Sequence, residues 1–236
     1  TGNPQITFFK VVYRRHTNFS MESIQQTFSG TVNYGSSVTA TISRNGDLVY
    51  RLYLEHEVSL KGAATADTIG VGADYGSHVM KEMELEIGGQ RIDRQYGHWH
   101  SVWSQLTEKN ASGSNTTLFN RMSGNGVGFD SANTSVNGFT NVDPGSGIDT
   151  IKGKFWIPLY FWFCRNPGLA LPLIALQYHE VKIKIIFESI GKLAANDTDD
   201  DFDGSGTAAD SSNNVESSET SFNLWCDYIY LDTDER

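Results

Sequence analysis

The chain has 236 residues and a formal net charge of −10, with 39% hydrophobic and 12% aromatic residues. This aromatic content excludes a wholly disordered chain, and the 23 glycines follow no collagen period. No apolar run approaches the roughly eighteen residues of a membrane-spanning helix. Eight acidic residues, with no Lys or Arg, lie between residues 196 and 221 and carry most of the surplus charge. This acidity disfavours direct binding to nucleic acid.

The dominant pattern along the chain is an alternation of apolar and polar residues, which is typical of half-buried strands. Asn45-Gly46 and Gly88-Gly89 each separate two such runs, and each therefore predicts a hairpin turn. Residues 155–163 are apolar almost throughout and predict a strand buried on both faces. The alternating runs predict further strands at residues 20–29, 38–42, 48–60, 83–87, 181–187 and 222–231.

Helical spacing is clear at one place, residues 98–109, where Trp99, Val102, Trp103 and Leu106 fall on one face. Trp99 and Trp103 are expected to pack this helix onto the sheets. A single helical turn is expected near residues 169–176. Residues 110–150 and 193–221 are expected to form long surface loops, and residues 1–20 an amino-terminal arm. Many strands, few helices and long loops indicate an all-β sandwich or barrel, a single domain over residues 1–236.

The sequence offers no catalytic constellation. A serine nucleophile elbow, a phosphate-binding loop and a paired-carboxylate motif are all missing, and His98 and His100, the one close histidine pair, point apart on a helix. We therefore expect a protein that is not an enzyme and that needs no cofactor. Cys164 and Cys226 lie in apolar surroundings and are expected to be buried, reduced thiols; a single bridge between neighbouring strands is the alternative.

The acidic segment contains a partial calcium motif. Its carboxylates follow the D-x-D-x-D-G spacing of a calcium loop and reach the twelfth position. The last ligand is Asp where Glu is usual, and no helix is evident on either side, so a solvated acidic loop is the favoured interpretation and calcium the alternative. The candidate metal ligands are Asp199, Asp201, Asp203 and Asp210.

Five sequons of the form Asn-x-Ser/Thr occur, four of them in the two long loops. They matter only if the chain meets the secretory machinery, and a chain rich in Asn, Ser and Thr contains several by chance. The candidate glycosylation sites are Asn18, Asn110, Asn115, Asn133 and Asn196.

Three long stretches together resemble one protein family. They are TGNPQITFFK followed by YRRHTNF (residues 1–19), FWIPL with FCRNPGLALP (residues 155–159 and 163–172), and YIYLDTDER (residues 228–236). They are similar to the signatures of the major capsid proteins of nucleocytoplasmic large DNA viruses. The resemblance covers essentially the whole chain. It implies an eight-stranded jelly-roll β-sandwich with one short helix and long decorated loops.

The resemblance also implies a function and partners. Proteins of this family have two consecutive jelly rolls, and the second is absent from this chain. Three copies form a pseudo-hexameric capsomer that tiles an icosahedral shell, so the implied partners are a homotrimer, neighbouring capsomers and minor capsid proteins. The implied location is the virion, after assembly in the host cytoplasm. The basic group in the arm, Lys10, Arg14, Arg15 and His16, could also meet an internal membrane.

No residue would perform chemistry in such a protein. The residues expected to carry packing or assembly are Trp99, Trp103, Phe155, Trp156 and Trp162. The last three are expected to build the core, with a share in a subunit interface as the alternative. Two alternatives share the fold: a carbohydrate-binding module assisted by calcium in the acidic loop, and a cupin-like enzyme. The second needs clustered histidine and glutamate ligands, and the histidines here are scattered.

Overall fold

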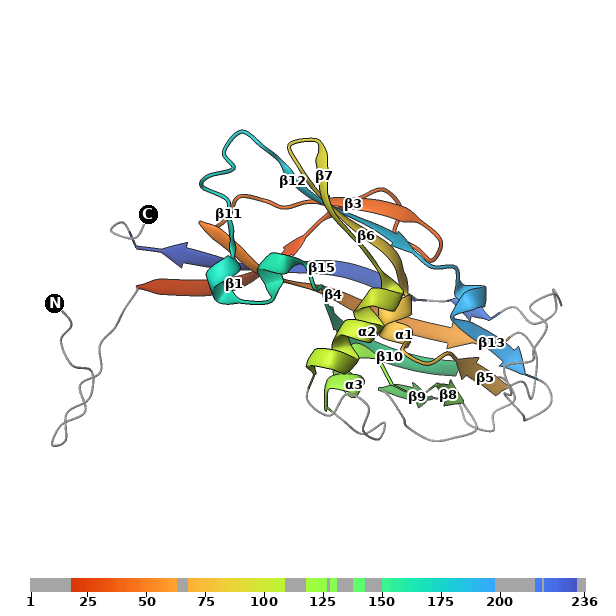
Figure 1. The fold of residues 1–236 in the computed structure, drawn as a ribbon. Coiled ribbons are helices and arrows are strands. Elements are labelled where there is room, and N and C mark those ends of the chain that lie inside the picture. Colours follow the sequence, from red (N-terminus) through yellow and green to blue (C-terminus); the bar gives the residue numbers. More distant parts are fainter. Residues whose placement is uncertain are drawn as a thin grey trace, which may run out of the picture.

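Two antiparallel sheets make up the body of the molecule in this computed structural model (Figure 1). The structure describes residues 18–62, 68–108, 118–126, 128–130, 138–142, 150–197, 215–217 and 219–232. The first sheet has the order β1 (Phe19–Gln26), β15 (Ser221–Leu231), β4 (Leu48–Lys61), β10 (Thr150–Pro158) and β9 (Phe139–Asn141), and β11 (Leu171–Pro172) and β14 (Glu216–Ser217) also pair with β4. The second sheet has the order β2 (Phe28–Ser29), β3 (Ser37–Thr41), β12 (Val181–Phe187), β6 (Met80–Ile87) and β7 (Gln90–Tyr96).

Smaller elements lie at the side and end of this sandwich. A third sheet consists of β13 (Ala194–Asp197), β5 (Thr68–Val71) and β8 (Phe129–Asp130). The α-helices are α1 (Tyr75–His78), α2 (Gly97–Thr107) and α3 (Leu118–Ser123), and the 3₁₀ turns are η1 (Trp162–Cys164), η2 (Pro167–Leu169) and η3 (Ile190–Lys192). Within the described residues, no helix is both long and apolar enough to span a bilayer.

The core lies between the two main sheets and follows from the period of two along each strand. On β12, Val181, Ile183 and Ile185 are buried while the intervening lysines are partly exposed. Leu52 and Leu54 of β4 belong to the same buried cluster. Each such side chain contributes roughly 1.5–3 kcal/mol when it leaves water. The alternating strands and the jelly-roll sandwich expected from the sequence are thus present.

One predicted hairpin is confirmed and the other is wrong. β6 and β7 pair across Gly88-Gly89, where both glycines have positive φ, +59° and +82°. Such angles at both central positions are what a tight hairpin of this type requires. The strands on either side of Asn45-Gly46 do not pair, because β3 lies in the second sheet and β4 in the first. Gly46 instead lets the backbone cross close to Tyr228, whose Cβ would be 2.9 Å from an added Cβ.

The helix expected at residues 98–109 is present as α2, but the prediction that Trp99 packs it onto the sandwich is wrong. Its buried residues are Gly97, His100, Ser101 and Ser104, whereas Trp99 is 37% exposed. The buried face is polar, and most of its side-chain groups have hydrogen-bond partners inside the molecule, His100 Nδ1 being without one among the described residues. Ser101 donates to Asp74 at 2.5 Å, and the ring of His100 bonds the Gln95 side chain at 3.0 Å.

Three further expectations need adjustment. The strand expected at residues 155–163 ends at Pro158, and it alternates in burial, so it is not buried on both faces. The chain then turns into η1 and η2, the second of which ends at Leu169, and the short strand β11 occupies part of the range 169–176. The ranges expected as long loops contain α3, β8 and β9 in the first and β13 and β14 in the second.

Candidate assembly surface

All five tryptophans lie at or near the molecular surface. Trp99 is exposed, and the other four are partly buried. Tryptophan is on average a well-buried residue in isolated domains and is enriched at the centres of protein interfaces. Because tryptophan is rarely fully buried, partial burial alone does not mark an interface, and the surroundings of each ring have to be considered.

Two of these tryptophans lie on the outer side of the first sheet. Phe155 and Ile157 of β10 point into the core, so Trp156 between them faces outward. Its ring centroid is 5.9 Å from that of Trp225 on β15. Glu55 of β4 lies in register with Trp156 and accepts a hydrogen bond from the indole of Trp225 at 2.7 Å. Strand pairing thus brings one carboxylate and two indoles together.

The charged groups on this outer side pair with one another, one lysine with two carboxylates. Lys154 lies 2.8 Å from Glu55 and 2.6 Å from Glu57. Partial burial opposes ionisation of Glu55, but hydrogen bonds from Lys154 and Trp225 outweigh it and keep the pKa of this carboxyl below its ordinary value. The same two carboxylates raise the pKa of Lys154. A surface of aromatic rings with paired charges suits a neutral protein partner better than an anionic polymer.

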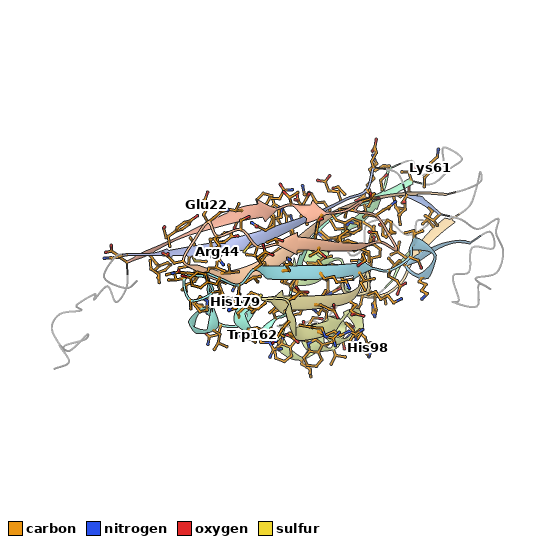
Figure 2. The ribbon with its side chains drawn as sticks, turned by 90° about the horizontal axis from the view of Figure 1, so that it is seen from above. Glu22, Arg44, Lys61, His98, Trp162 and His179 are labelled. Atoms are coloured by element: carbon orange, nitrogen blue, oxygen red, sulfur yellow. The ribbon has the colours of Figure 1, made fainter. Side chains whose placement is uncertain are left out.

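The remaining tryptophans lie around α2 and η1. The rings of Trp99 and Trp103 are 5.5 Å apart on α2, and the guanidinium of Arg165 lies 4.3 Å above the Trp103 ring. Trp162 packs edge-on against the buried ring of Phe163 at 5.3 Å. Figure 2 places Trp162 at the same side of the molecule as His98 of α2. We call Trp99, Trp103, Trp156, Trp162 and Trp225 the tryptophan surface.

Phe155 belongs to the core, as expected, whereas Trp156 and Trp162, which were expected there too, are only partly buried. Phe155 is fully buried, and its ring lies 4.8 Å from that of Phe139. Three glycines leave room for this ring, because an added Cβ at Gly124, Gly138 or Gly153 would come within 3.0 Å of it. An assembly role for the four predicted tryptophans stays a prediction, and Trp225 is the member of the surface that the sequence analysis did not single out.

The structure brings together few of the other candidates. The calcium candidates lie outside the described residues, as do Asn110, Asn115 and Asn133. The part of the chain that is described contains no group of three His, Cys, Asp or Glu placed to hold a metal ion. Asn18 is exposed and donates to Asp232 at 3.0 Å. Asn196 does not lie in a loop, because its backbone pairs with Ile69 in the third sheet.

Both cysteines are free thiols. Cys226 is buried on β15, and Cys164 is partly buried on η1. Burial raises the pKa of Cys164 to about 12 and raises that of Cys226 as well. The expectation of buried, reduced thiols agrees with these positions.

A buried polar cluster lies inside the sandwich and was not anticipated from the sequence. His56 is fully buried on β4, stacked on Phe222 at 4.1 Å between ring centroids. Its Nε2 lies 2.8 Å from the hydroxyl of Tyr75, which is 2.7 Å from that of Tyr34. Desolvation lowers the pKa of His56 to about 4, against a smaller opposing effect of the Ser221 carbonyl. The signal in the sequence was a histidine at an inward position of an apolar strand.

Solved structures with the same arrangement are shell proteins of viruses. The chain superimposes on VP54 of PBCV-1, as fitted into a reconstruction of the virophage Sputnik, with a TM-score of 0.68 and 36% identity, covering 97% of this chain and 46% of that chain. The Faustovirus major capsid protein gives a TM-score of 0.62 at 13% identity, which supports the fold alone. The fold is therefore that of the jelly-roll capsid proteins.

Sequence comparison then gives the family. Residues 7–232 match the model of the major capsid protein N-terminus, and the chain belongs to this family. The major capsid protein of Pyramimonas orientalis virus is 48% identical over 100% of this chain and 50% of its own length. That of Paramecium bursaria Chlorella virus 1 is 39% identical over 100% of this chain and 45% of its own length. The chain thus spans about half the length of the curated relatives that it matches.

Proposed function

We propose that this chain is the first jelly roll of the major capsid protein of a large DNA virus. Its function is mechanical: it builds the outer shell by packing against other subunits. The observation that carries the proposal is the family match over nearly the whole chain, residues 7–232. A relative that bears this name is 48% identical to the chain over 239 aligned residues.

We further propose that the working unit is a homotrimer in which each polypeptide supplies two jelly rolls, so that three copies give a pseudo-hexameric capsomer. The support is that relatives are about twice as long as the matched region. Neighbouring capsomers would then be the second class of partner. Such an assembly depends on protein–protein contacts alone, so the proposed role requires neither a cofactor nor a catalytic residue.

The amino-terminal arm gives the third part of the proposal. Lys10, Arg14, Arg15 and His16 form a short basic group in a chain whose net charge is −10. Such a group suits anionic lipid headgroups or the acidic surfaces of minor capsid proteins on the inner side of the shell. The long Gly/Ser-rich and acidic loops would face solvent. The protein would be found in the virion after assembly in the host cytoplasm, without direct contact to nucleic acid.

The oligomeric state tests the mechanical role. The protein, expressed to the full length of its open reading frame, is purified and measured by light scattering and single-particle electron microscopy. A stable trimer with six-fold pseudo-symmetry is the expected result. A monomer at all concentrations up to those that give visible precipitation would contradict the proposal.

A vesicle assay tests the arm separately. Sedimentation with liposomes that contain phosphatidylserine should retain the protein, and neutral phosphatidylcholine liposomes should not. Replacing Arg14 and Arg15 with serine should abolish retention, while the same change at Lys61 and Lys81, which also removes two positive charges, serves as a matched control. Equal retention by both variants would refute the proposed lipid contact.

The comparisons give no support to a carbohydrate-binding module, because the named relatives and the shared fold point to capsid proteins.

A further inference from the structure

Four segments that are distant in the sequence meet at the buried ring of His56. The ring belongs to β4 and stacks on Phe222 of β15, with 4.1 Å between the ring centroids. The carbonyl of Ser221 lies 3.1 Å from its Nδ1, and the hydroxyl of Tyr75, the first residue of α1, lies 2.8 Å from its Nε2. The hydroxyl of Tyr34, in the turn between β2 and β3, lies 2.7 Å from that of Tyr75. One ring thus links two strands, a helix and a turn.

The hydrogen bonds around this ring define its protonation state. A carbonyl oxygen can only accept, so Nδ1 carries the proton and donates to Ser221. The unprotonated Nε2 then accepts from Tyr75, whose oxygen accepts in turn from Tyr34. Burial raises the pKa of both phenols, which keeps them protonated. Both nitrogens of the imidazole therefore have partners while the ring is neutral.

The surroundings of the ring contain no charge that could stabilise an imidazolium. The described residues beside it are Phe155 of β10, Phe222 of β15, Tyr75 of α1 and Tyr34 of the turn. A pocket of about 260 Å³ is lined by Tyr75 but not by His56, and its charged or titratable lining residues are His78, Glu188 and Lys192. A buried charge without a counter-ion is strongly unfavourable. Desolvation accordingly lowers the pKa of His56 to about 4.

The turn that carries Tyr34 is the most loosely attached cover of the ring. The strands β4, β10 and β15 are held by ladders of hydrogen bonds along their lengths. Residues 33–36 contact the end of β12 through two backbone bonds, from Gly35 to the carbonyl of Glu188 at 3.0 Å and from Phe187 to the carbonyl of Ser36 at 2.9 Å. Tyr34 itself is partly exposed. An outward movement of this turn would therefore open the ring to water while the strands stay paired.

From these observations we propose that His56 and the turn at residues 33–36 form an acid-operated latch, in which a proton on the imidazole releases Tyr34 and its turn from the sandwich. The latch belongs to the jelly roll itself and does not depend on the proposed function. The proton converts Nε2 from an acceptor into a donor, so Tyr75 can no longer donate to it. The charge that remains requires water, and the displaced Tyr34 admits it.

Linkage gives the expected size of the effect. In the open state the imidazole is hydrated and its pKa returns to about 6.5. In the closed state this pKa is about 4. The open state therefore takes up more protons as the pH falls, and the ratio of open to closed molecules rises about twentyfold from pH 7 to pH 5.

Hydrogen exchange followed by mass spectrometry measures this ratio on the full-length protein, after correction for the intrinsic pH dependence of exchange. The informative peptides contain the amides of Gly35 and Phe187, whose hydrogen bonds break when the turn leaves. Their opening constants should rise about twentyfold from pH 7 to pH 5. Peptides from the centre of β6, which has paired strands on both sides, should exchange far more slowly than the turn at both pH values.

Two variants separate the latch from a purely structural role. His56→Gln keeps a donor and an acceptor but does not titrate, so the twentyfold rise should disappear. The matched control His98→Gln changes an exposed ring and should keep the whole rise. Tyr34→Ala removes the cover, so the pKa of His56, followed by NMR of the imidazole protons, should move from about 4 to near its ordinary value.

The outcomes that would overturn the latch are distinct. The first is an opening constant of the turn that is equal at the two pH values. The second is a rise that persists in His56→Gln, and the third is a Tyr34→Ala protein in which the pKa of His56 stays near 4. Exchange of the β6 peptides at the same rate as the turn would show global unfolding in place of a local opening. None of these results bears on whether the chain assembles into a capsid.

Discussion

Acidification from pH 7 to pH 5 should destabilise this protein through two histidines that the fold buries in the neutral form. Desolvation lowers the pKa of His56 to about 4 and that of His100 to about 3. In the unfolded chain both return to an ordinary value near about 6.5. Once the pH falls below that value, the unfolded state binds more protons than the native state. The free energy of unfolding therefore decreases as the pH decreases.

The size of the effect follows from linkage. At pH 5 both histidines are still neutral in the native protein, while an unfolded histidine is almost fully protonated. Each therefore lowers the free energy of unfolding by about 2 kcal/mol between pH 7 and pH 5, and the two together by about 4 kcal/mol. The result depends little on the native pKa values as long as they lie well below 5. The hydrogen bond from Arg94 keeps the pKa of Glu82 below its ordinary value. This carboxylate therefore stays ionised between pH 7 and pH 5 and does not contribute to the loss.

Urea denaturation followed by tryptophan fluorescence at the two pH values measures this loss. The variant His56→Phe keeps the stacking on Phe222 but loses the hydrogen bonds to Tyr75 and Ser221, so its stability at pH 7 should fall. The difference in its free energy of unfolding between pH 7 and pH 5 should be half that of the wild type. The control His98→Gln changes an exposed ring and should retain the whole difference. A wild-type loss below about 1 kcal/mol, or a His56→Phe variant with the full loss, would refute the reasoning.

Three further predictions concern packing and reactivity. Gly76→Ala should prevent stable folding, because an added Cβ would lie 1.7 Å from a backbone oxygen, and circular dichroism on heating would show this. Phe155→Ala should lower the free energy of unfolding by about 3–5 kcal/mol in urea titrations, since the ring fills a fully buried site. Cys164 and Cys226 should react with Ellman's reagent at pH 8 far more slowly in the folded protein than in urea, because burial raises both thiol pKa values.

Each of these has a matched control. Gly191→Ala adds a Cβ into open space and should leave the thermal midpoint within a few degrees of wild type. Trp156→Ala removes a larger but partly exposed side chain and should cost less stability than Phe155→Ala. A Gly76→Ala protein with wild-type stability, or cysteines that react at the same rate with and without urea, would contradict the described packing.

The comparison of the two hairpin predictions shows what local sequence decides. Gly88-Gly89 forms a tight turn because both residues adopt positive φ, which glycine permits without strain. Gly46 does not have a positive φ; it is required by the close approach of Tyr228 on another strand. Turn propensity is encoded within a few residues, whereas the choice between pairing and crossing to the other sheet depends on contacts with residues as distant in sequence as Tyr228.

The helix α2 shows why the position of an element was easier to predict than its orientation. The apolar spacing located the helix correctly, but burial of the apolar stripe was assumed. The sandwich instead buries His100, Ser101 and Ser104, whose partners come from α2 itself and from separate loops and strands. A polar face becomes a buried face only when those partners are present, and the order of residues along one helix cannot reveal them.

For the assembly surface, the sequence indicated which residue types to consider but not which of them lie together in space. Trp156 and Trp162 were singled out by their place in an apolar signature, and Trp225, on a distant strand, joins Trp156 only through strand pairing. The buried hydroxyl of Tyr160, which has no hydrogen-bond partner among the described residues, has no sequence signal at all, since it depends on what the surrounding side chains fail to supply.

The pairing of the first and last strands has a consequence for how such a unit can be rearranged. β1 and β15 are antiparallel neighbours, with Phe19 opposite Leu231, and Asn18 bonds Asp232 just beyond them (Figure 1). Chain entry and chain exit therefore share one corner of the sandwich. A gene segment with this property can be duplicated in tandem, inserted into a host loop or circularly permuted through a short linker, because none of these events separates strands that must pair.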